Sequence, residues 1–395
     1  MDGNVSLCDT KDFGNVLKFH LLLGPACNMR CRHCSQTADK RVDLFGGPLS
    51  PKVWGLIRNY VSYSVENASE DLFVKKRRLI FWGGEALLHW DTICDVVSRT
   101  EREFGFTFHK NFRFTIVSNG LLLTEDKVRF INGKKIGFCF SYDAPHPFAV
   151  RDYVPESVCG LVRKIRGYCV HASVNAINDD PLTAFRCLKA KFPDADDIDV
   201  NPKLTQAEGI PKDTYDWDWD AVRRGVRRIR IAAQLGDVFV RDLILRYYLC
   251  TGDPSGVPMG RANGACVYGN NFMNCTLNGK VLACYNSFKQ IGTVDDSMET
   301  LRTRSRERLD SMASPDCRDC RHLDVCGGNR CFVNAQDKDN RFYACHNYWL
   351  RFYDILKEEM SVIDRPLSDA DREWYAGQER IIYAKVKEFM TEYGG

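Results

Sequence analysis

Three cysteines near the start of the chain are spaced to bind one inorganic cluster. Cys27, Cys31 and Cys34 form a Cys-x3-Cys-x2-Cys pattern within eight residues. A cubane iron–sulfur cluster normally takes four cysteine ligands, so three thiolates would leave one iron open for a substrate, as a catalytic zinc site keeps one position open. The alternative is a zinc ion with His33 as fourth ligand. We disfavour it because His33 lies between two of the cysteines, where joint coordination is sterically awkward.

A second group of cysteines lies in the last third of the chain, where nine of the eighteen fall between Cys250 and Cys345. Seven of them and a glycine follow the pattern Cys266-x12-Gly279-x4-Cys284, Cys317-x2-Cys320-x5-Cys326-x4-Cys331 and Cys345. The N-terminus has no export signal, and a reducing cytosol makes a disulfide framework improbable. Clustered cysteines therefore indicate metal ligands, with a zinc ribbon as the alternative to iron–sulfur clusters.

Composition excludes several classes of partner. The formal net charge is +3, and no run of Lys or Arg is interleaved with aromatic residues, so neither nucleic acid nor an acidic membrane surface is expected as partner. No apolar stretch reaches the roughly 20 residues that a membrane-spanning helix needs. The sequence therefore predicts a cytoplasmic protein with no membrane or nucleic-acid partner.

Alternating strand and helix patterns fill the first half of the chain. Strands are expected at residues 17–23, 78–82, 112–117, 136–141, 171–177 and 196–200. Helices are expected at residues 50–65, 87–103, 125–131, 155–166 and 182–191. Six strands with helices between them predict an α/β fold, a partial (β/α)6 TIM-like barrel, with function on the loops after the strand C-termini.

Changes in local composition and pattern divide the chain into four parts. Residues 1–210 would form the partial barrel and residues 211–259 a connector, whose basic stretch 221–230 we interpret as a solvated helix face. Residues 260–350 are short, loop-rich and cysteine-rich, so they would form a small iron–sulfur domain stabilised by metal ligation. Residues 351–395 would form a helical tail, with Ser368 and Asp371 spaced as a capping box before another helix.

The three-cysteine motif after a first strand resembles the radical S-adenosylmethionine (SAM) superfamily. His33 occupies the position before the third cysteine, where that family commonly has an aromatic residue. The resemblance implies a [4Fe–4S] cluster held by Cys27, Cys31 and Cys34, whose open iron binds the amino and carboxylate groups of SAM. One-electron reduction would then cleave SAM to methionine and a 5′-deoxyadenosyl radical.

Further motifs at the ends of the later strands support the resemblance. Trp82–Glu85 is similar to the family's GGE motif but has Ala86 where proline is usual, and Ser118–Gly120 is similar to its Ser/Thr-Asn-Gly segment. The resemblance implies SAM-binding roles for His33, Gly83, Gly84, Glu85, Ser118, Asn119, Ser141, Arg151, Asn175 and Ile177. It also places Asp143 at the ribose or the substrate, as a candidate catalytic residue, with a structural hydrogen bond as the alternative.

The later cysteines resemble the SPASM extension of radical SAM enzymes that modify peptides and proteins, which usually binds two auxiliary [4Fe–4S] clusters. Carried over by position, the ligands of the first would be Cys266, Cys284 and Cys331, with Cys275 as candidate fourth, and those of the second would be Cys317, Cys320, Cys326 and Cys345. The family's last spacing is x3, and here it is x4. Cys250, between barrel and extension, is a candidate thiol for returning hydrogen to a substrate radical.

These features predict an oxidoreductase that matures a ribosomally made peptide, giving a thioether or carbon–carbon crosslink or another oxidation. A reducing partner such as flavodoxin or ferredoxin would supply electrons. Only 26 residues precede Cys27, so we expect a leader peptide to be recognised by other surfaces or by a separate protein.

Two alternatives remain open. One is oxidation of Cys or Ser to formylglycine, as in anaerobic sulfatase maturases, which characteristically have Asp after the cysteine matching Cys284, where this chain has Tyr285. The other is an electron-transfer or structural metal protein.

Overall fold

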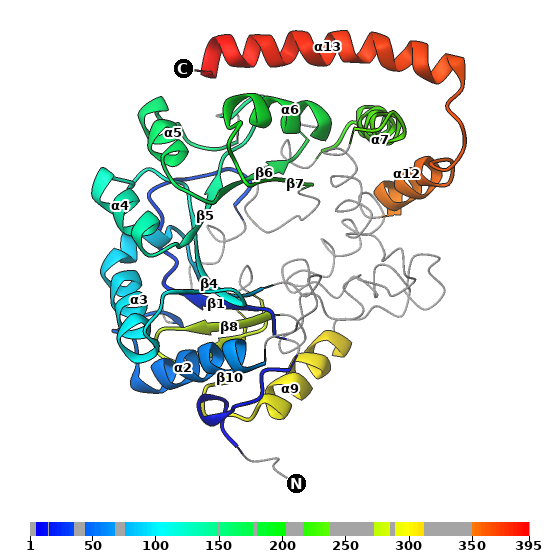
Figure 1. Ribbon diagram of the computed structural model, residues 1–395. Helices are drawn as coiled ribbons and strands as arrows, with labels where there is room; N and C mark the ends of the chain where they lie inside the picture. The colour runs from blue at the N-terminus through cyan, green and yellow to red at the C-terminus, as the bar shows by residue number, and fades with distance from the viewer. Residues whose placement is uncertain are drawn as a thin grey trace.

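One open, mostly parallel sheet organises the molecule. The computed structural model (Figure 1) describes residues 5–14, 16–34, 44–67, 76–147, 150–176, 180–202, 216–237, 272–284, 289–311 and 350–394. The strands lie in the order β10-β9-β8-β1-β2-β4-β5-β6-β7, and β3 pairs with β4. Pairing is parallel from β8 through β7 and antiparallel at β3, β9 and β10. Within these residues β10 and β7 are opposite edges, so the sheet does not close into a full barrel.

All six predicted strands are confirmed. They are β1 (Lys18–Leu22), β2 (Arg77–Trp82), β4 (Phe112–Ser118), β5 (Gly137–Ser141), β6 (Tyr168–Val174) and β7 (Asp197–Pro202), with the short β3 (Phe108–His109) beside β4. The start of β6 differs from the prediction. This strand begins three residues before the predicted start because its pairing with β5 begins at Tyr168, opposite Phe138. Pairing partners, which the local pattern does not contain, set that boundary.

The predicted helices lie along the outside of the curved sheet (Figure 1). They are α2 (Pro51–Glu66), α3 (Trp90–Phe104), α4 (Glu125–Gly133), α5 (Glu156–Arg163) and α6 (Pro181–Lys191), with 3-10 turns η1 (Leu7–Asp9) and η3 (Ala86–His89). Side-chain caps start several of them, since Ser50, Thr124 and Asp180 each accept a bond from a backbone N–H three residues later. The helix predicted from Leu87 instead begins as η3 and becomes α-helical at Trp90.

Alternation along β1 separates the interior of the barrel from the helix layer. Phe19 faces outward and packs edge-on against Tyr60 of α2, with ring centroids 5.5 Å apart. His20 faces the other way, 5.8 Å from the ring of Trp82. Both faces of β1 are buried, which is typical of a strand at the centre of a parallel sheet. Odd-numbered positions of β1 therefore face the core under the helix layer, and even-numbered positions face the interior of the barrel.

Part of the cysteine-rich region extends the same sheet. β8 (Phe272–Thr276) pairs in parallel with β1, placing Cys275 opposite Leu21, and β9 (Lys280–Leu282) and β10 (Gln290–Thr293) continue from it. Helix α9 (Met298–Ser311) follows. The predicted domain boundaries stay a prediction, but the described sheet continues beyond residue 260.

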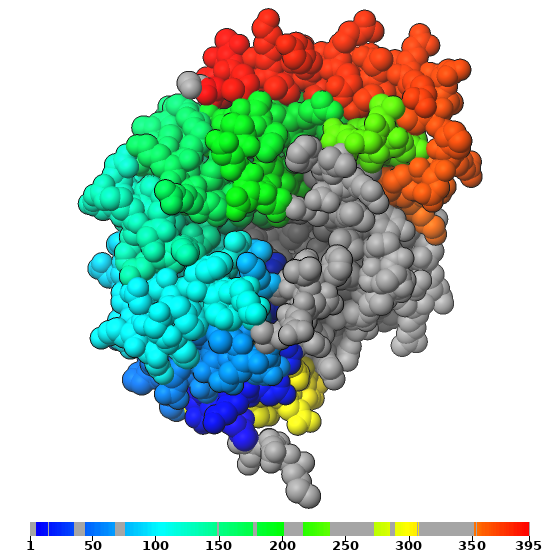
Figure 2. Space-filling model, viewed as in Figure 1, coloured from blue at the N-terminus to red at the C-terminus, as the bar shows by residue number. Residues whose placement is uncertain are grey.

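Three helices from the second half of the chain cover one side of the barrel. α13 (Asp369–Tyr393) lies across α6 and α7 (Trp219–Gln234), with α12 (Leu350–Met360) beside α7 (Figures 1 and 2). The basic stretch of α7, expected to be solvated, instead bonds this tail: Arg230 Nε donates to Glu359 Oε2 at 2.9 Å, and Arg227 Nη2 donates to Asp371 Oδ1 at 2.7 Å. The predicted cap is confirmed, since Ser368 Oγ accepts from the Asp371 N–H at 3.1 Å.

No helix in the described ranges has the length and apolar character to cross a bilayer.

Candidate active site

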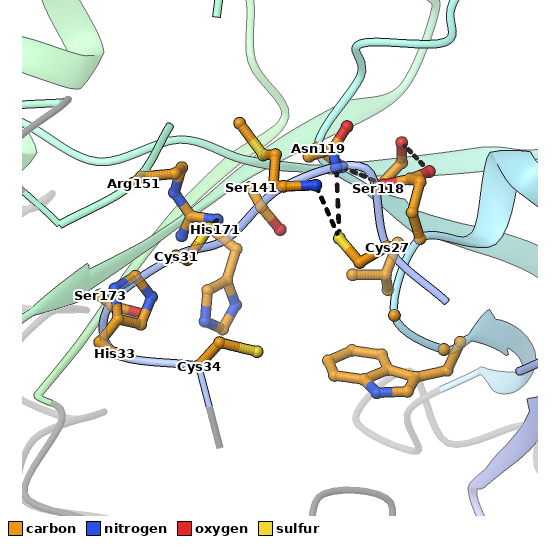
Figure 3. Close-up of a pocket in the computed structure, with 16 residues that line it drawn as sticks. Cys27, Cys31, His33, Cys34, Ser118, Asn119, Ser141, Arg151, His171 and Ser173 are labelled. Atoms are coloured by element: carbon orange, nitrogen blue, oxygen red, sulfur yellow. Dashed lines mark hydrogen bonds between the residues drawn. The ribbon is translucent and has the colours of Figure 1, made fainter. Parts of the chain in front are cut away.

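Most of the functional residues predicted from the first half of the chain line one pocket at the C-terminal ends of the barrel strands. It opens onto about 800 Å³ of space, its mouth included, and Figure 3 shows the side chains around it. It is lined by Cys27, Met29, Cys31, His33, Cys34, Trp82, Gly83, Gly84, Glu85, Val117, Ser118, Asn119, Ser141, Arg151, His171 and Ser173. Side chains from β2, β4, β5 and β6 thus converge on the loop that follows β1, as expected where parallel strands end.

The glycine pair after β2 allows that loop to lie against it. The Gly84 N–H donates to Gly24 O at 2.8 Å, and the Glu85 N–H donates to Ala26 O at 2.8 Å. A Cβ on Gly84 would lie 2.3 Å from Ala26 O, and one on Gly83 would lie 2.6 Å from Gly24 O. The glycines were expected to admit SAM, and the structure shows that they first admit the chain's own cysteine loop.

Hydrogen-bond donors point at the sulfur atoms of the cysteine loop. The Met29 N–H lies 3.4 Å from Cys27 Sγ and Asn119 Nδ2 lies 3.9 Å from it, while Arg151 Nη1 lies 3.9 Å from Cys31 Sγ. Burial raises the pKa of Cys27 to about 11 and raises the pKa of Cys31 as well. Raised pKa values keep these thiols protonated when no metal is bound. A metal would displace the protons, and the donors would then stabilise the thiolates.

The placement of these thiols is compatible with an iron–sulfur cluster. Within the described residues, no three His, Cys, Asp or Glu side chains are arranged to hold one metal ion. A zinc site would need its four ligands to meet around one atom. Cysteines of an iron–sulfur cluster can each bind a different iron, so they surround the cluster and do not meet at a point. Three thiols facing one pocket fit the second arrangement.

Glu85 is buried and ties two strand ends together. Its Oε1 accepts bonds from the Leu87 N–H at 2.8 Å and from Ser118 Oγ at 2.7 Å, and its Oε2 accepts the Asn119 N–H at 2.8 Å. Burial raises its pKa, and the two backbone donors and Ser118 oppose that rise. The carboxylate therefore holds the turn after β4 against the loop after β2. A carboxylate oxygen has two lone pairs, so Oε2 can accept a further donor.

The turn after β4 also contacts the cysteine loop. Asn119 Nδ2 donates to Asn28 Oδ1 at 2.8 Å, and its Oδ1 accepts the Leu121 N–H at 3.0 Å. Gly120 has a φ of +78°, in the left-handed region that glycine adopts without strain. The Ser-Asn-Gly segment thus positions Asn119 beside the first cysteine, in addition to lining the pocket.

Asp143 lies behind the pocket wall and holds Arg151. Arg151 Nε donates to Asp143 Oδ2 at 3.0 Å, Nη2 donates to Oδ1 at 3.2 Å, and the Ser173 N–H donates to Oδ1 at 2.8 Å. Burial opposes ionisation of Asp143, but Arg151, His33 and Ser173 outweigh it and hold its pKa below the usual value. The segment around Arg151 also braces the cysteine loop, since Val150 O accepts the Arg32 N–H at 2.7 Å.

Comparison with protein families identifies the barrel. Residues 21–178 match the model of the radical SAM superfamily. The chain contains a radical SAM domain. The match begins in β1 and runs through β6, so it includes all the residues that line the pocket.

Solved structures share the fold of this radical SAM domain and of much of the remaining chain. Native anSMEcpe with bound AdoMet is 16% identical, with a TM-score of 0.57, over 88% of this chain and 99% of that one. Streptococcus suis SuiB bound to its precursor peptide SuiA is 14% identical, with a TM-score of 0.56, over 82% of this chain and 74% of that one. Identity this low establishes the fold alone. A search of curated protein sequences finds no match.

The remaining predicted residues lie in three settings. Asn175 is fully buried just after β6 and is not one of the residues that line the radical SAM pocket. Cys275 and Cys284 are buried, and Cys275 Sγ lies 3.3 Å from Thr276 O in the core beside β1. Burial raises the pKa of Cys275. This environment gives Cys275 a packing role, and its role as a ligand stays a prediction. Outside the described residues lie Ile177, Cys250, Cys266, Cys317, Cys320, Cys326, Cys331 and Cys345.

Sequence reasoning missed two residues of the radical SAM pocket that lie on β6. His171 lines the pocket with Ser173, and its Nδ1 lies 3.5 Å from Asp199 Oδ2 on β7. A signal was available: positions 171, 173 and 175 alternate on one face of a strand, and Asn175 had already been assigned to the interior. Trp82, the first residue of the quoted glycine motif, also lines the pocket.

Proposed function

We propose that this chain is a radical SAM maturase that oxidatively modifies a ribosomally made peptide. The observation that carries the proposal is the single pocket in which the three-cysteine loop faces Glu85, Asn119, Ser141 and Arg151. These residues come from separate strand ends, and the resemblance to radical SAM enzymes implies a SAM-binding role for each. A chance set of motifs would not converge in this way.

The pocket offers complementary groups for several parts of SAM. Cys27, Cys31 and Cys34 would hold a four-iron cluster, and when bound the cluster supplies an electron and an open iron for the methionine end of SAM. Glu85 Oε2 would accept a hydrogen bond from the SAM ammonium group. Ser141 and Asn119 would bond the ribose. Arg151 would contribute positive charge beside Cys31, offsetting the thiolates.

The bonds between Arg151 and Asp143 limit how Arg151 could contact SAM. Two of its nitrogens already bond Asp143, which fixes the plane of the guanidinium. Only Nη1 is directed to Cys31, at 3.9 Å. We therefore propose that Arg151 stabilises the anionic cluster loop and reaches the SAM carboxylate through this one nitrogen, while Asp143 acts as its anchor.

A peptide substrate is supported by the solved structures of the same fold. One is anSMEcpe with bound AdoMet and the Cp18Cys peptide, 16% identical with a TM-score of 0.58. Another is SuiB bound to the precursor peptide SuiA. The cysteine pattern of the last third of the chain points the same way, because two auxiliary [4Fe–4S] clusters could accept an electron from a substrate radical. A reducing cytoplasmic setting with a flavodoxin or ferredoxin as electron donor completes the proposal.

Anaerobic reconstitution followed by iron counting and a SAM-cleavage assay tests the proposal. Three four-iron clusters predict about 12 iron atoms per chain, with 5′-deoxyadenosine formed when a reductant is added. Combined substitution of Cys27, Cys31 and Cys34 by Ala should remove about four iron atoms and abolish SAM cleavage. Cys94→Ala, on α3 outside the pocket, is the matched control and should leave both unchanged. Zinc in place of iron, or cleavage retained by the triple variant, would refute the assignment.

Peptide modification needs a separate measurement. Candidate peptides encoded beside the gene should gain a modification that mass spectrometry detects as a loss of two hydrogen atoms, only with SAM and reductant present. Formylglycine formation in a sulfatase-derived peptide would instead support the second function considered above. SAM cleavage without modification of any such peptide would contradict the maturase proposal while leaving the SAM site intact.

A further inference from the structure

Two cysteines outside every cluster motif face each other in the barrel, one layer below the pocket. Cys139 on β5 pairs directly with Cys169 on β6. Two residues further along the same strands, Ser141 and His171 line the pocket. Side chains two positions apart on a strand share a face, so both thiols point into the barrel interior, beneath the floor of the pocket.

The backbone spacing at this pair suits a covalent bond. Neighbouring strands lie about 4.7–4.9 Å apart, and a disulfide joins residues whose Cα atoms are about 4.4–6.8 Å apart. The two thiols are close enough to shift each other's pKa. Both residues are partly buried and not sealed within the core. Little movement of the sheet is required to join them.

The surroundings make the two sulfur atoms unequal. The Cys139 thiol lowers the pKa of Cys169, and the Arg78 guanidinium lowers it further, against burial and the carboxylates of Asp197 and Asp199. The Cys169 thiol and burial raise the pKa of Cys139. One thiolate stabilised by its neighbour's proton is typical of a reactive dithiol, in which the first thiol attacks and the second resolves.

Two other interpretations of this pair fit less well. A metal site would need a third ligand, and among the described residues no group of three His, Cys, Asp or Glu side chains is arranged around an ion. Simple packing describes Cys159 and Cys187, in each of which burial raises the pKa to about 12. Of the described cysteines whose pKa is shifted, Cys169 alone has a lowered pKa.

We propose that Cys139 and Cys169 form a redox-active dithiol, which a small-molecule disulfide converts to an intramolecular disulfide beneath the cofactor pocket. The Cys169 thiolate attacks one sulfur of the oxidant and releases its other half as a thiol. Cys139 then loses its proton and attacks Cys169 Sγ, forming the Cys139–Cys169 bond and releasing the second half as a thiol. The protein loses two electrons and two protons, and the oxidant gains them.

The chain is well suited to a direct test. Trypsin cleaves after Lys135, Arg151, Arg166 and Arg186, which gives peptides 136–151 and 167–186 with one cysteine each. Reconstituted full-length protein is treated anaerobically with oxidised glutathione, quenched in acid, alkylated and digested. We expect the two peptides to appear crosslinked in most molecules, with the crosslink lost on adding a thiol reductant. Iron content measured before and after shows that the clusters remain.

Single variants test the order of the two steps. Cys139→Ser should stop the reaction halfway, leaving Cys169 as a mixed disulfide with glutathione. Cys169→Ser should leave Cys139 open to alkylation, and Cys159→Ser should crosslink as the wild type does. Peptides 136–151 and 167–186 that both remain alkylated in oxidised wild-type protein would overturn the proposal. So would crosslinks of Cys169 to other cysteines with equal yield. The wild-type result stands even where a Ser variant fails to fold.

Discussion

Asp143 and Arg151 form a two-point ion pair behind the radical SAM pocket, with side-chain exposures of 0% and 9%. Their bonds of 3.0 and 3.2 Å use both carboxylate oxygens and two guanidinium nitrogens, and the third nitrogen of Arg151 faces Cys31. The pair therefore connects the end of β5 to the cysteine loop. Removing either partner leaves the other charge buried without its counterion.

Replacing Asp143 should destabilise the protein strongly. Asp143→Ala leaves the Arg151 cation buried and the Ser173 N–H without its acceptor, so we expect a loss of about 3–5 kcal/mol in the free energy of unfolding. Asp143→Asn, which keeps the shape and one acceptor oxygen, should cost less. Anaerobic urea denaturation measures both losses. A loss below about 1 kcal/mol for the Ala variant would show that the pair is solvated.

The same pair predicts a dependence of stability on pH. The pKa of Asp143 is lower in the folded chain than its usual value, so the folded state binds fewer protons than the unfolded state. The stability from this group is present above the unfolded pKa of about 3.9 and is lost as the pH falls through the folded value. The stability difference between wild type and Asp143→Asn should be constant near neutral pH and shrink below about pH 4. A difference that grows with acid would contradict the ion pair.

Adding a methyl group at Gly84 should displace the cysteine loop. The new Cβ would lie 2.3 Å from Ala26 O and 2.4 Å from Pro25 O, and both are backbone atoms that cannot rotate away. We expect Gly84→Ala to lose about four iron atoms and its SAM cleavage. Gly160→Ala is the matched control, because its Cβ meets nothing within 4 Å in helix α5. That change should stabilise the chain by about 0.5–1 kcal/mol. Full iron content in Gly84→Ala would disprove the close packing.

Glu85→Gln should weaken SAM binding with only a moderate effect on stability. The amide nitrogen of Gln cannot accept a bond, so at least one of the donors from Leu87, Ser118 and Asn119 loses its acceptor. An unsatisfied buried donor costs about 1–3 kcal/mol. We expect SAM affinity to fall by roughly tenfold, which corresponds to about 1.4 kcal/mol. Glu125→Gln, which loses an exposed pair with Lys164, is the control and should bind SAM as the wild type does.

The C-terminal tail should depend on one buried ion pair more than on its exposed ones. Arg230 and Glu359 have side-chain exposures of 6% and 12%, so Arg230→Ala should cost about 3–5 kcal/mol. Arg223 pairs with Glu358 of α12, with exposures of 44% and 64%, so Arg223→Ala should cost less than about 1 kcal/mol. Thermal unfolding and limited proteolysis of the tail measure the difference. Equal effects would show that α7 does not hold α12 through this bond.

The sequence by itself determined the strands, the helices and the cysteine loop. Alternation and helical periodicity are local properties, so all six barrel strands and the helices between them could be predicted within a few residues. The motifs after β1, β2 and β4 were predictable for the same reason. Their glycines, cysteines and polar residues lie next to one another in the chain. Topology then required these strand ends to meet.

Only the tertiary structure decided which residues contact one another across the barrel. Asp143 was predicted to lie at the ribose or the substrate, with a structural hydrogen bond as the alternative, and in the structure it accepts bonds from Arg151 and from the Ser173 N–H of β6. His171 and Ser173 entered the pocket because pairing with β5 set the register of β6. Cys139 and Cys169 are 30 residues apart in sequence and opposite each other in the sheet. Such contacts depend on strand order and register, which come from the packing of the whole chain and not from any local pattern.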